Sequence, residues 1–282
     1  MEIKTIGIAG AGTMGIGIAQ VVATNGFNTV LFDLNENVLT KSKSILVKNL
    51  DYLISKQKIT SVDKEQILNR IFFTTDIEQL KADLIIEAIV ERIDVKQEFF
   101  VKVAAINSDN TILASNTSSI PITQIAAAVP KPERFLGIHF FNPAPIMKLV
   151  EIINGIETNS EISAFCKQLI EKMGKVCVVA NDSPGFIVNR VARHYYVESL
   201  KIVEENVTDF KSVDDLLEAS GFKMGPFRLM DLIGVDTNFS VTSSIYNLFH
   251  QEGKFRPSII QKQKVNAGHF GRKTGKGFYT YE

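Results

Sequence analysis

The chain has 282 residues, of which 45% are hydrophobic, and its 31 basic and 31 acidic residues give a formal net charge of zero. This length allows two domains of ordinary size, and this composition excludes a disordered chain. The neutral total argues against a nucleic-acid-binding protein, which normally carries a basic face. No apolar run is long enough to cross a bilayer and the first residues do not resemble a secretory leader, so we expect a cytoplasmic protein.

Short apolar runs alternate with longer amphipathic stretches over about the first 180 residues. The expected strands are residues 6–10, 28–33, 70–75, 84–89, 111–116, 135–140, 148–153 and 175–180. Helical patterns at 35–57 and 92–106 lie between some of them. The strands are rich in Val, Ile, Leu and Phe with little alternation, which is typical of a sheet covered on both faces. We therefore predict an α/β domain with a doubly wound, parallel sheet of the Rossmann type.

The pattern changes near residue 181. Ser183 is a candidate helix cap and Pro184 suits a first helical turn. The later segments 188–206, 213–220, 234–251 and 257–267 have helical patterns, and no strand is expected after residue 180. We predict a first domain over residues 1–182 and an all-α domain over residues 183–282.

A glycine loop follows the first expected strand and opens a helix. The sequence GAGTMG places Gly10, Gly12 and Gly15 in the G-x-G-x-x-G pattern, with Thr13 and Met14 between the second and third glycines. Such a loop lets a pyrophosphate approach the backbone at a helix N-terminus. Asp33 ends the second strand and can bind the adenosine ribose while repelling the extra phosphate of NADP, which favours NAD. The alternative is that Asp33 caps the following helix.

Four polar residues form a candidate catalytic set: Ser118, His139 and Glu151 in or just after expected strands, and Asn189 in the first turns of the long helix. A neutral histidine can remove a hydroxyl proton near pH 7, and a carboxylate can orient it. Glu151 lies within an apolar run, where a carboxylate is costly unless it is paired. A lone histidine near a buried strand is more often structural, and Ser118 alone could be a turn residue, so both alternatives stay open. We expect no metal site, because the other histidines lack clustered ligands.

Seven segments carry a resemblance to a known family. They are GAGTMGIGIAQ, EAIVERIDVKQEFF, ASNTSSIPI, GIHFFNPAPIMKLVEII, DSPGFIVNRV, MGPFRLMDLIGVD and GRKTGKGFY. Together they resemble the L-3-hydroxyacyl-CoA dehydrogenase family over essentially the whole chain. The resemblance implies NAD-dependent oxidation of a (S)-3-hydroxyacyl-CoA, of short chain such as 3-hydroxybutyryl-CoA, to the 3-ketoacyl-CoA in fatty-acid β-oxidation. It also implies a homodimer. The helical domain would then both join the two subunits and bind substrate.

The resemblance assigns roles to individual residues. His139 is similar to the family's base, Glu151 to the carboxylate that orients it, Ser118 to the serine that binds the substrate oxygen, and Asn189 to the asparagine that holds the acyl group. The positions similar to those lining the NAD site are Gly10, Gly12, Thr13, Met14, Gly15, Asp33, Glu91, Lys96, Asn116, Ser118, Asn142 and Lys273. Lys56 is the nearest match to a lysine that contacts CoA, although it could equally be a solvated surface lysine.

Three other functions remain as alternatives. The later helical segments are similar to enzymes of aromatic-acid degradation that act on 3-hydroxyadipyl-CoA, for which Arg193 or Arg228 could bind the distal carboxylate. A β-hydroxyacid dehydrogenase of the phosphogluconate type would need a catalytic lysine on the long helix, which has none before Lys201. A non-catalytic, crystallin-like NAD-binding protein would not require all four candidate catalytic residues.

Overall fold

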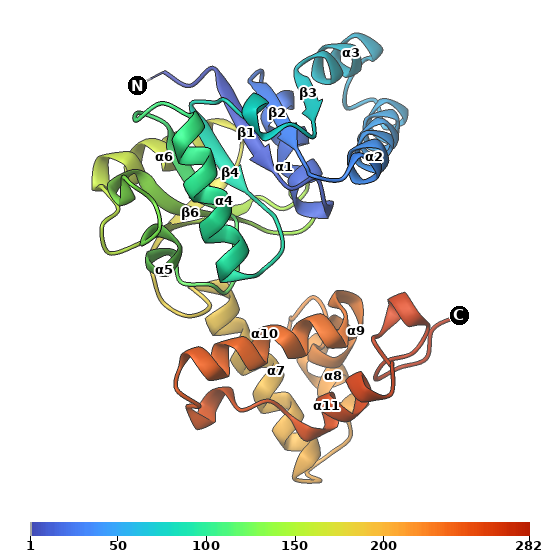
Figure 1. The fold of residues 1–282 in the computed structure, drawn as a ribbon. Helices are drawn as coiled ribbons and strands as arrows, with labels where there is room; N and C mark the ends of the chain where they lie inside the picture. Colours follow the sequence, from blue (N-terminus) through green and yellow to red (C-terminus); the bar gives the residue numbers. More distant parts are fainter. Residues whose placement is uncertain (1) are drawn as a thin grey trace. The chain divides into compact units, whose positions relative to one another are not determined.

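The computed structural model describes residues 2–282, which form two compact units that meet in sequence between Ser183 and Pro184. The first unit contains a sheet flanked by helices and the second is helical (Figure 1). None of the helices within residues 2–282 is both long and apolar enough to span a bilayer.

The first unit is built on one eight-stranded sheet. Its strands are β1 (Thr5–Ala9), β2 (Asn28–Phe32), β3 (Ile71–Thr74), β4 (Leu84–Glu87), β5 (Ile112–Ser115), β6 (Phe135–Phe140), β7 (Leu149–Asn154) and β8 (Val176–Asn181). All eight expected runs therefore form strands, and the prediction of a Rossmann-type sheet is confirmed. Buried apolar side chains of these strands and of the flanking helices together form the core of this unit.

The strand order is β3-β2-β1-β4-β5-β6-β7-β8. Every neighbouring pair is parallel except β6 and β7, which run antiparallel. The order reverses between β1 and β4, and open α/β sheets bind ligands at the carboxyl ends of the strands at such a point. The glycine loop follows β1, so the topology directs a ligand to this edge.

Helices cover both faces of the sheet (Figure 1). They are α1 (Thr13–Thr24), α2 (Glu36–Ser55), α3 (Ser61–Asn69), α4 (Ile93–Ile106), α5 (Ile122–Ala126) and α6 (Ser160–Lys172), with 3₁₀ turns η1 (Ile77–Gln79) and η2 (Pro132–Arg134). The helices expected at 35–57 and 92–106 correspond to α2 and α4. Local side chains explain several starts: Asn159 caps α6, and Thr60 with Asp63 forms a capping box before α3.

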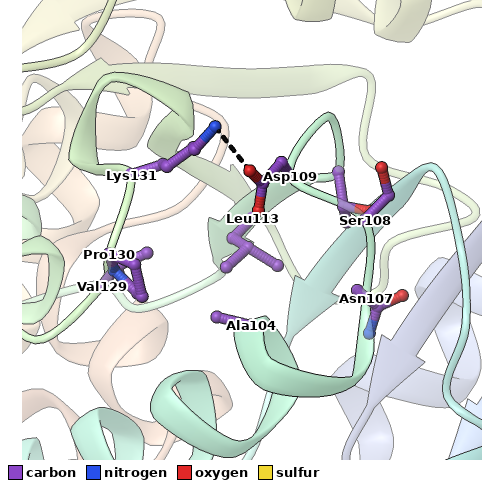
Figure 2. A pocket seen from close by; sticks show the side chains of 9 residues that line it. Ala104, Asn107, Ser108, Asp109, Leu113, Val129, Pro130 and Lys131 are labelled. Atoms are coloured by element: carbon purple, nitrogen blue, oxygen red, sulfur yellow. Dashed lines mark ion pairs between the residues drawn. The ribbon is translucent and has the colours of Figure 1, made fainter.

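A small hollow of about 70 Å³ lies beside the amino end of β5. Figure 2 shows its lining residues, which are Ala104, Asn107, Ser108, Asp109, Thr111, Leu113, Val129, Pro130 and Lys131. An ion pair of 2.9 Å joins Asp109 to Lys131 at its rim. This hollow is at the opposite edge of the sheet from the glycine loop and is too small for a nucleotide, so it is separate from the candidate site.

The second unit contains helices and 3₁₀ turns. They are α7 (Val188–Glu204), α8 (Phe210–Ala219), α9 (Pro226–Ile233), η3 (Gly253–Phe255), α10 (Val235–Leu248), α11 (Ile259–Asn266) and η4 (Arg272–Thr274). Its core includes aromatic and aliphatic side chains such as Leu200, Phe227 and Phe278. The expected helical segments are all present, and no named strand occurs after β8 in the described chain.

The predicted start of the long helix was wrong. Ser183 and Pro184 were expected to cap and open it, but α7 begins at Val188. Gly185 has φ +73° and Phe186 has φ 49°, and both values lie in the left-handed region. A right-handed helix cannot run through such residues, so the chain turns once more before α7 starts.

A buried carboxylate fixes the last residues of the chain. Asp231 of α9 accepts hydrogen bonds of 2.9 Å from the backbone N–H groups of Phe278 and Tyr279 and from the Tyr281 hydroxyl. A Cβ on Gly277 would lie 2.0 Å from the Asp231 Oδ1, so only glycine fits there. The segment that carries Lys273 is therefore held firmly against α9.

Candidate active site

The glycine loop has the shape that a pyrophosphate requires. Gly10 has φ +93°, and a Cβ on it would lie 2.5 Å from the Ala88 carbonyl oxygen. A Cβ on Gly15 would lie 1.7 Å from the Gly10 carbonyl oxygen, whereas one on Gly12 would meet nothing within 4 Å. Gly10 and Gly15 thus allow the turn to form, and Gly12 keeps its outer side open at the first turn of α1, where unpaired N–H groups favour an anion.

Asp33 lies beside the glycine loop and does not cap a helix. Its Oδ2 accepts a hydrogen bond of 2.8 Å from the Ala11 N–H, and its Oδ1 accepts one of 3.0 Å from the Asn35 N–H. The cap of α2 is Asn35, whose side chain accepts a hydrogen bond from Asn37. The capping interpretation of Asp33 is therefore wrong, and its half-buried carboxylate faces the loop instead.

A cavity of about 570 Å³ opens at this edge of the sheet. Its lining is mostly apolar and comprises Gly10, Gly12, Phe32, Asp33, Leu34, Val38, Ile77, Ala88, Ile89, Val90, Val95, Glu98, Phe99 and Lys102. This volume is ordinary for a site that takes a small molecule or part of a cofactor. Since Gly12 and Asp33 both line the cavity, its residues fit the adenosine half of a dinucleotide.

His139 and Glu151 form a buried pair near the carboxyl end of β6. They are directly opposite each other on the antiparallel strands β6 and β7, and 2.8 Å separates the His139 Nδ1 from the Glu151 Oε2. The imidazole is 6% exposed and the carboxylate 0%. The ring of Phe141 lies 4.5 Å from the imidazole, between ring centroids. The turn between the strands therefore brings the two side chains together, as the sequence led us to expect.

The loop after β5 adjoins this pair. The Asn116 Oδ1 accepts a hydrogen bond of 2.8 Å from the backbone N–H of Phe140, next to His139. The Ser118 N–H donates to the Glu91 Oε1 at 3.3 Å, and the hydroxyl of Ser119 donates to the same oxygen at 3.0 Å. Asn116, Ser118 and Glu91 thus lie at the same edge of the sheet as His139, while Ser118 stays partly exposed.

Lys96 is enclosed rather than open to a ligand. Its side chain is 1% exposed, and its ammonium lies 2.5 Å from Glu87 and 3.2 Å from Glu91. Burial opposes the ionisation of Glu91, but Lys96 and the hydroxyls of Thr117 and Ser119 hold the pKa of Glu91 below its usual value. Burial raises the pKa of Glu87, against the opposing effect of Lys96. Lys96 was expected to line the cofactor site, and its contacts are with these carboxylates.

Glu87 and Lys175 were missed from the sequence. Glu87 is a carboxylate within the apolar run of β4. A carboxylate within an apolar run is the signal that identified Glu151 in β7, so Glu87 could have been found in the same way. The Lys175 ammonium donates to the carbonyl oxygens of Ala144 (2.5 Å) and Met147 (2.9 Å), and burial lowers its pKa. Lys175 therefore fixes the segment that follows Asn142, while Asn142 itself is exposed. No sequence pattern indicates such a contact between a lysine and backbone carbonyl groups.

The remaining candidate residues lie apart from this cluster in the chain. Asn189 is in the first turn of α7, where its backbone oxygen accepts a 3.3 Å hydrogen bond from Arg193. Lys273 of η4 pairs with Asp236 at 2.7 Å. Lys56 is exposed just after α2, with its ammonium 5.6 Å from the centroid of the Tyr52 ring.

The two arginines considered for a distal carboxylate already have partners. Arg193 is buried and donates to the Asn238 carbonyl oxygen at 3.0 Å and to the Thr242 hydroxyl at 2.7 Å. Burial lowers the pKa of Arg193 to about 10. Arg228 pairs with Asp215 and Glu218, each at 3.0 Å. A substrate carboxylate would have to displace these contacts.

Two family models match nearly all of the chain. The NAD binding domain of 3-hydroxyacyl-CoA dehydrogenase matches residues 5–183, and the C-terminal domain of the same family matches residues 185–281. The chain belongs to the 3-hydroxyacyl-CoA dehydrogenase family. The prediction of the family, of an oxidoreductase and of NAD as its cofactor is thereby confirmed.

Named relatives and a solved structure agree with this family. The chain is 43% identical to 3-hydroxyadipyl-CoA dehydrogenase of Escherichia coli strain K12, over 100% of its own length but 60% of that protein. It is 39% identical to 3-hydroxybutyryl-CoA dehydrogenase of Bradyrhizobium diazoefficiens, with 99% and 96% of the two chains covered. A crystal structure of (S)-3-hydroxybutyryl-CoA dehydrogenase from Ralstonia eutropha matches with a TM-score of 0.95 and 39% identity over 100% of both chains.

Proposed function

We propose that this 3-hydroxyacyl-CoA dehydrogenase oxidises short-chain (S)-3-hydroxyacyl-CoA to 3-ketoacyl-CoA with NAD, and that His139 is the base. The observation that carries the proposal is the buried contact of 2.8 Å between His139 and Glu151, beside the loop that carries Ser118. A carboxylate is rarely buried unless it serves a partner, and here the partner is an imidazole. The relatives of similar length support a four-carbon acyl group.

Each catalytic residue then has a chemical task. The Glu151 carboxylate accepts a hydrogen bond from the His139 Nδ1–H, so the lone pair of the neutral ring is on Nε2. Nε2 takes the hydroxyl proton of the substrate, and Glu151 stabilises the imidazolium that forms. The Ser118 hydroxyl binds the same substrate oxygen, and Asn189 holds the acyl group. NAD would supply the hydride acceptor for C3 of the substrate.

The proposed cofactor site uses the same edge of the sheet. Gly10, Gly12 and Gly15 admit the pyrophosphate to the backbone beside Thr13 and Met14, and Asp33 receives the adenosine ribose. Glu91, Asn116, Ser118 and Asn142 line the nicotinamide half, and Lys96 is bound behind Glu91. The family resemblance assigns Lys273 to the cofactor as well. We place Lys56 against CoA, since an exposed lysine can pair with a phosphate.

A substrate panel tests this proposal. Wild-type protein is assayed by NADH formation with 3-hydroxyacyl-CoA of four to ten carbons, with 3-hydroxyadipyl-CoA, and with free 3-hydroxyacids. We expect the highest kcat/KM for the four-carbon thioester with NAD, and little reaction of free acids or with NADP. The hydrogen bonds of Arg193 and the ion pairs of Arg228 already occupy both side chains, which argues against 3-hydroxyadipyl-CoA, the substrate in the name of the E. coli relative. A preference for that dicarboxylate would reject the short-chain assignment, and tight NAD binding without any turnover would reject catalysis.

The protein is also proposed to be a homodimer joined through its helical unit. Several large apolar side chains of this unit are exposed, including Leu216, Phe222, Leu232 and Ile233. Such side chains are common at subunit interfaces. Sedimentation velocity tests the proposal, since a single species with a mass of one chain (31.3 kDa) would contradict it.

A further inference from the structure

The loop that carries Asn116 and Ser118 is bonded at each end to a carboxylate, Glu87 or Glu91, and both carboxylates contact Lys96. At its start, the Ser115 hydroxyl donates to the Glu87 Oε2 at 2.7 Å, and the Glu87 Oε1 accepts from the Lys96 ammonium at 2.5 Å. At its end, Thr117, Ser118 and Ser119 all donate to Glu91, which lies 3.2 Å from the same ammonium.

Glu87 occupies the innermost place in this network. Its carboxylate is 0% exposed and accepts a further hydrogen bond of 2.7 Å from the Ile89 N–H, at the start of the segment leading to Glu91. The proposed mechanism gives Glu87 no proton to transfer and no substrate atom to contact. Yet β4, β5 and α4 all meet at this side chain, because Glu87, Ser115 and Lys96 belong to these three elements.

We propose that Glu87 is a positioning residue, which holds Lys96 and, through Glu91, keeps the Asn116–Ser119 loop in the geometry that the reaction needs. This inference rests on the proposed function for its effect on rate, but its effect on the loop is independent of that function. Two carboxylates share one ammonium. Without the inner charge, Lys96 is free to shift towards Glu91, and the hydrogen bonds to Thr117, Ser118 and Ser119 shift with it.

The expected effect on kcat follows from how strongly the reaction rate depends on the position of such groups. A displacement of about 1 Å in a positioning group can reduce a rate on the order of 100-fold. Glu87→Gln keeps the shape and one acceptor oxygen, so we expect a smaller loss, about tenfold or more in kcat. Because Asp33 and the glycine loop hold the adenosine half, the Kd for NAD should change by a smaller factor than kcat. A general loss of folded protein would instead lower the number of NAD sites.

The experiment compares Glu87→Gln with a matched control at the other end of the same strand. Asp83 immediately precedes β4, and its carboxylate accepts backbone hydrogen bonds from Lys4 (2.8 Å) and Thr5 (2.9 Å). Asp83→Asn therefore removes the charge of a carboxylate that fixes the backbone at the opposite edge of the sheet, away from the loop. A milder variant, Ser115→Ala, removes the hydroxyl that donates to Glu87 and accepts a 3.2 Å hydrogen bond from the Thr117 N–H, and it should fold if Glu87→Gln does not.

Three quantities are measured for each variant: kcat and KM with (S)-3-hydroxybutyryl-CoA, NAD binding by calorimetry, and hydrogen–deuterium exchange of residues 116–120 without ligands. We expect a fall in kcat and faster exchange in Glu87→Gln, a weaker form of both in Ser115→Ala, and neither in Asp83→Asn. Unchanged exchange in the loop, or equal changes in the Asp83 control, would overturn the inference. If wild-type protein turns over no hydroxyacyl-CoA, the proposed function fails, and the exchange data alone decide whether Glu87 holds the loop.

Discussion

Replacing Glu151 by Gln isolates the charge of the buried carboxylate. The substitution keeps the size of the side chain and an acceptor oxygen near the His139 Nδ1, 2.8 Å from the present Oε2. As His139 takes the substrate proton it becomes a cation, and Glu151 is the carboxylate it contacts. With charge centres about 4 Å apart and an effective dielectric constant of about 20, the lost attraction is about 4 kcal/mol.

That energy sets the size of the effect. A loss of about 4 kcal/mol in the transition state corresponds to about three powers of ten in rate. The remaining amide still accepts a hydrogen bond and offsets part of the loss, so we expect kcat to fall about 10²- to 10³-fold. The KM for (S)-3-hydroxybutyryl-CoA and the Kd for NAD should change little, because Glu151 contacts neither in the proposed mechanism.

The assay is the initial rate of NADH formation at saturating NAD, with thermal unfolding measured in parallel. Glu171→Gln is the control, since its partly exposed carboxylate in α6 makes only a 3.4 Å surface pair with Lys167. Such pairs contribute about 0–1 kcal/mol to stability, and the control should keep full activity. A kcat for Glu151→Gln within threefold of wild type would refute the reasoning.

Three further predictions concern the cofactor site and the thiols. Gly12→Ala should keep the wild-type Tm but weaken NAD binding at least about tenfold, because the new methyl meets open space where the pyrophosphate is expected. Gly15→Ala should instead lower Tm sharply, because its Cβ clashes with the Gly10 carbonyl oxygen. Calorimetry and thermal melts test this, and equal effects of the two substitutions on Tm and on NAD affinity would contradict it. Asp33→Asn should raise the KM for NAD relative to that for NADP, and an unchanged ratio of the two constants would contradict the assigned role. Burial raises the pKa of Cys166 to about 12 and that of Cys177 to about 11, so at pH 8 both thiols stay protonated and should react with a disulfide reagent only after unfolding.

The sheet was predictable because each strand reads as a short, mainly apolar run. β5 and β6, for example, are buried on both faces, so nearly every residue in them is hydrophobic. The short turn between β6 and β7 makes this pair antiparallel, because a parallel crossover needs about a dozen residues or more. The start of α7 was not predictable, because Ser183 and Pro184 make a good local cap while Gly185 and Phe186 adopt left-handed conformations that depend on tertiary contacts.

The candidate site was only partly accessible from the sequence. Glu151 stood out because a carboxylate interrupts an apolar run, and the structure gives it a partner in His139. Lys96 could not be placed, because whether an amphipathic helix turns a lysine outwards or inwards depends on what lies opposite. Here the carboxylates of Glu87 and Glu91 lie opposite Lys96, and their ion pairs with its ammonium stabilise the lysine in the interior. The sequence records these three charges but not their distances.

The central claim is that His139 removes the substrate proton, and His139→Gln tests it most directly. The measurement is the kcat for NADH formation from (S)-3-hydroxybutyryl-CoA, with the Kd for NAD as the control for folding. The account predicts a kcat about 10²- to 10⁴-fold below that of wild type, the usual contribution of a positioned base, with NAD affinity unchanged. A variant that turns over at the wild-type rate would show that another group is the base.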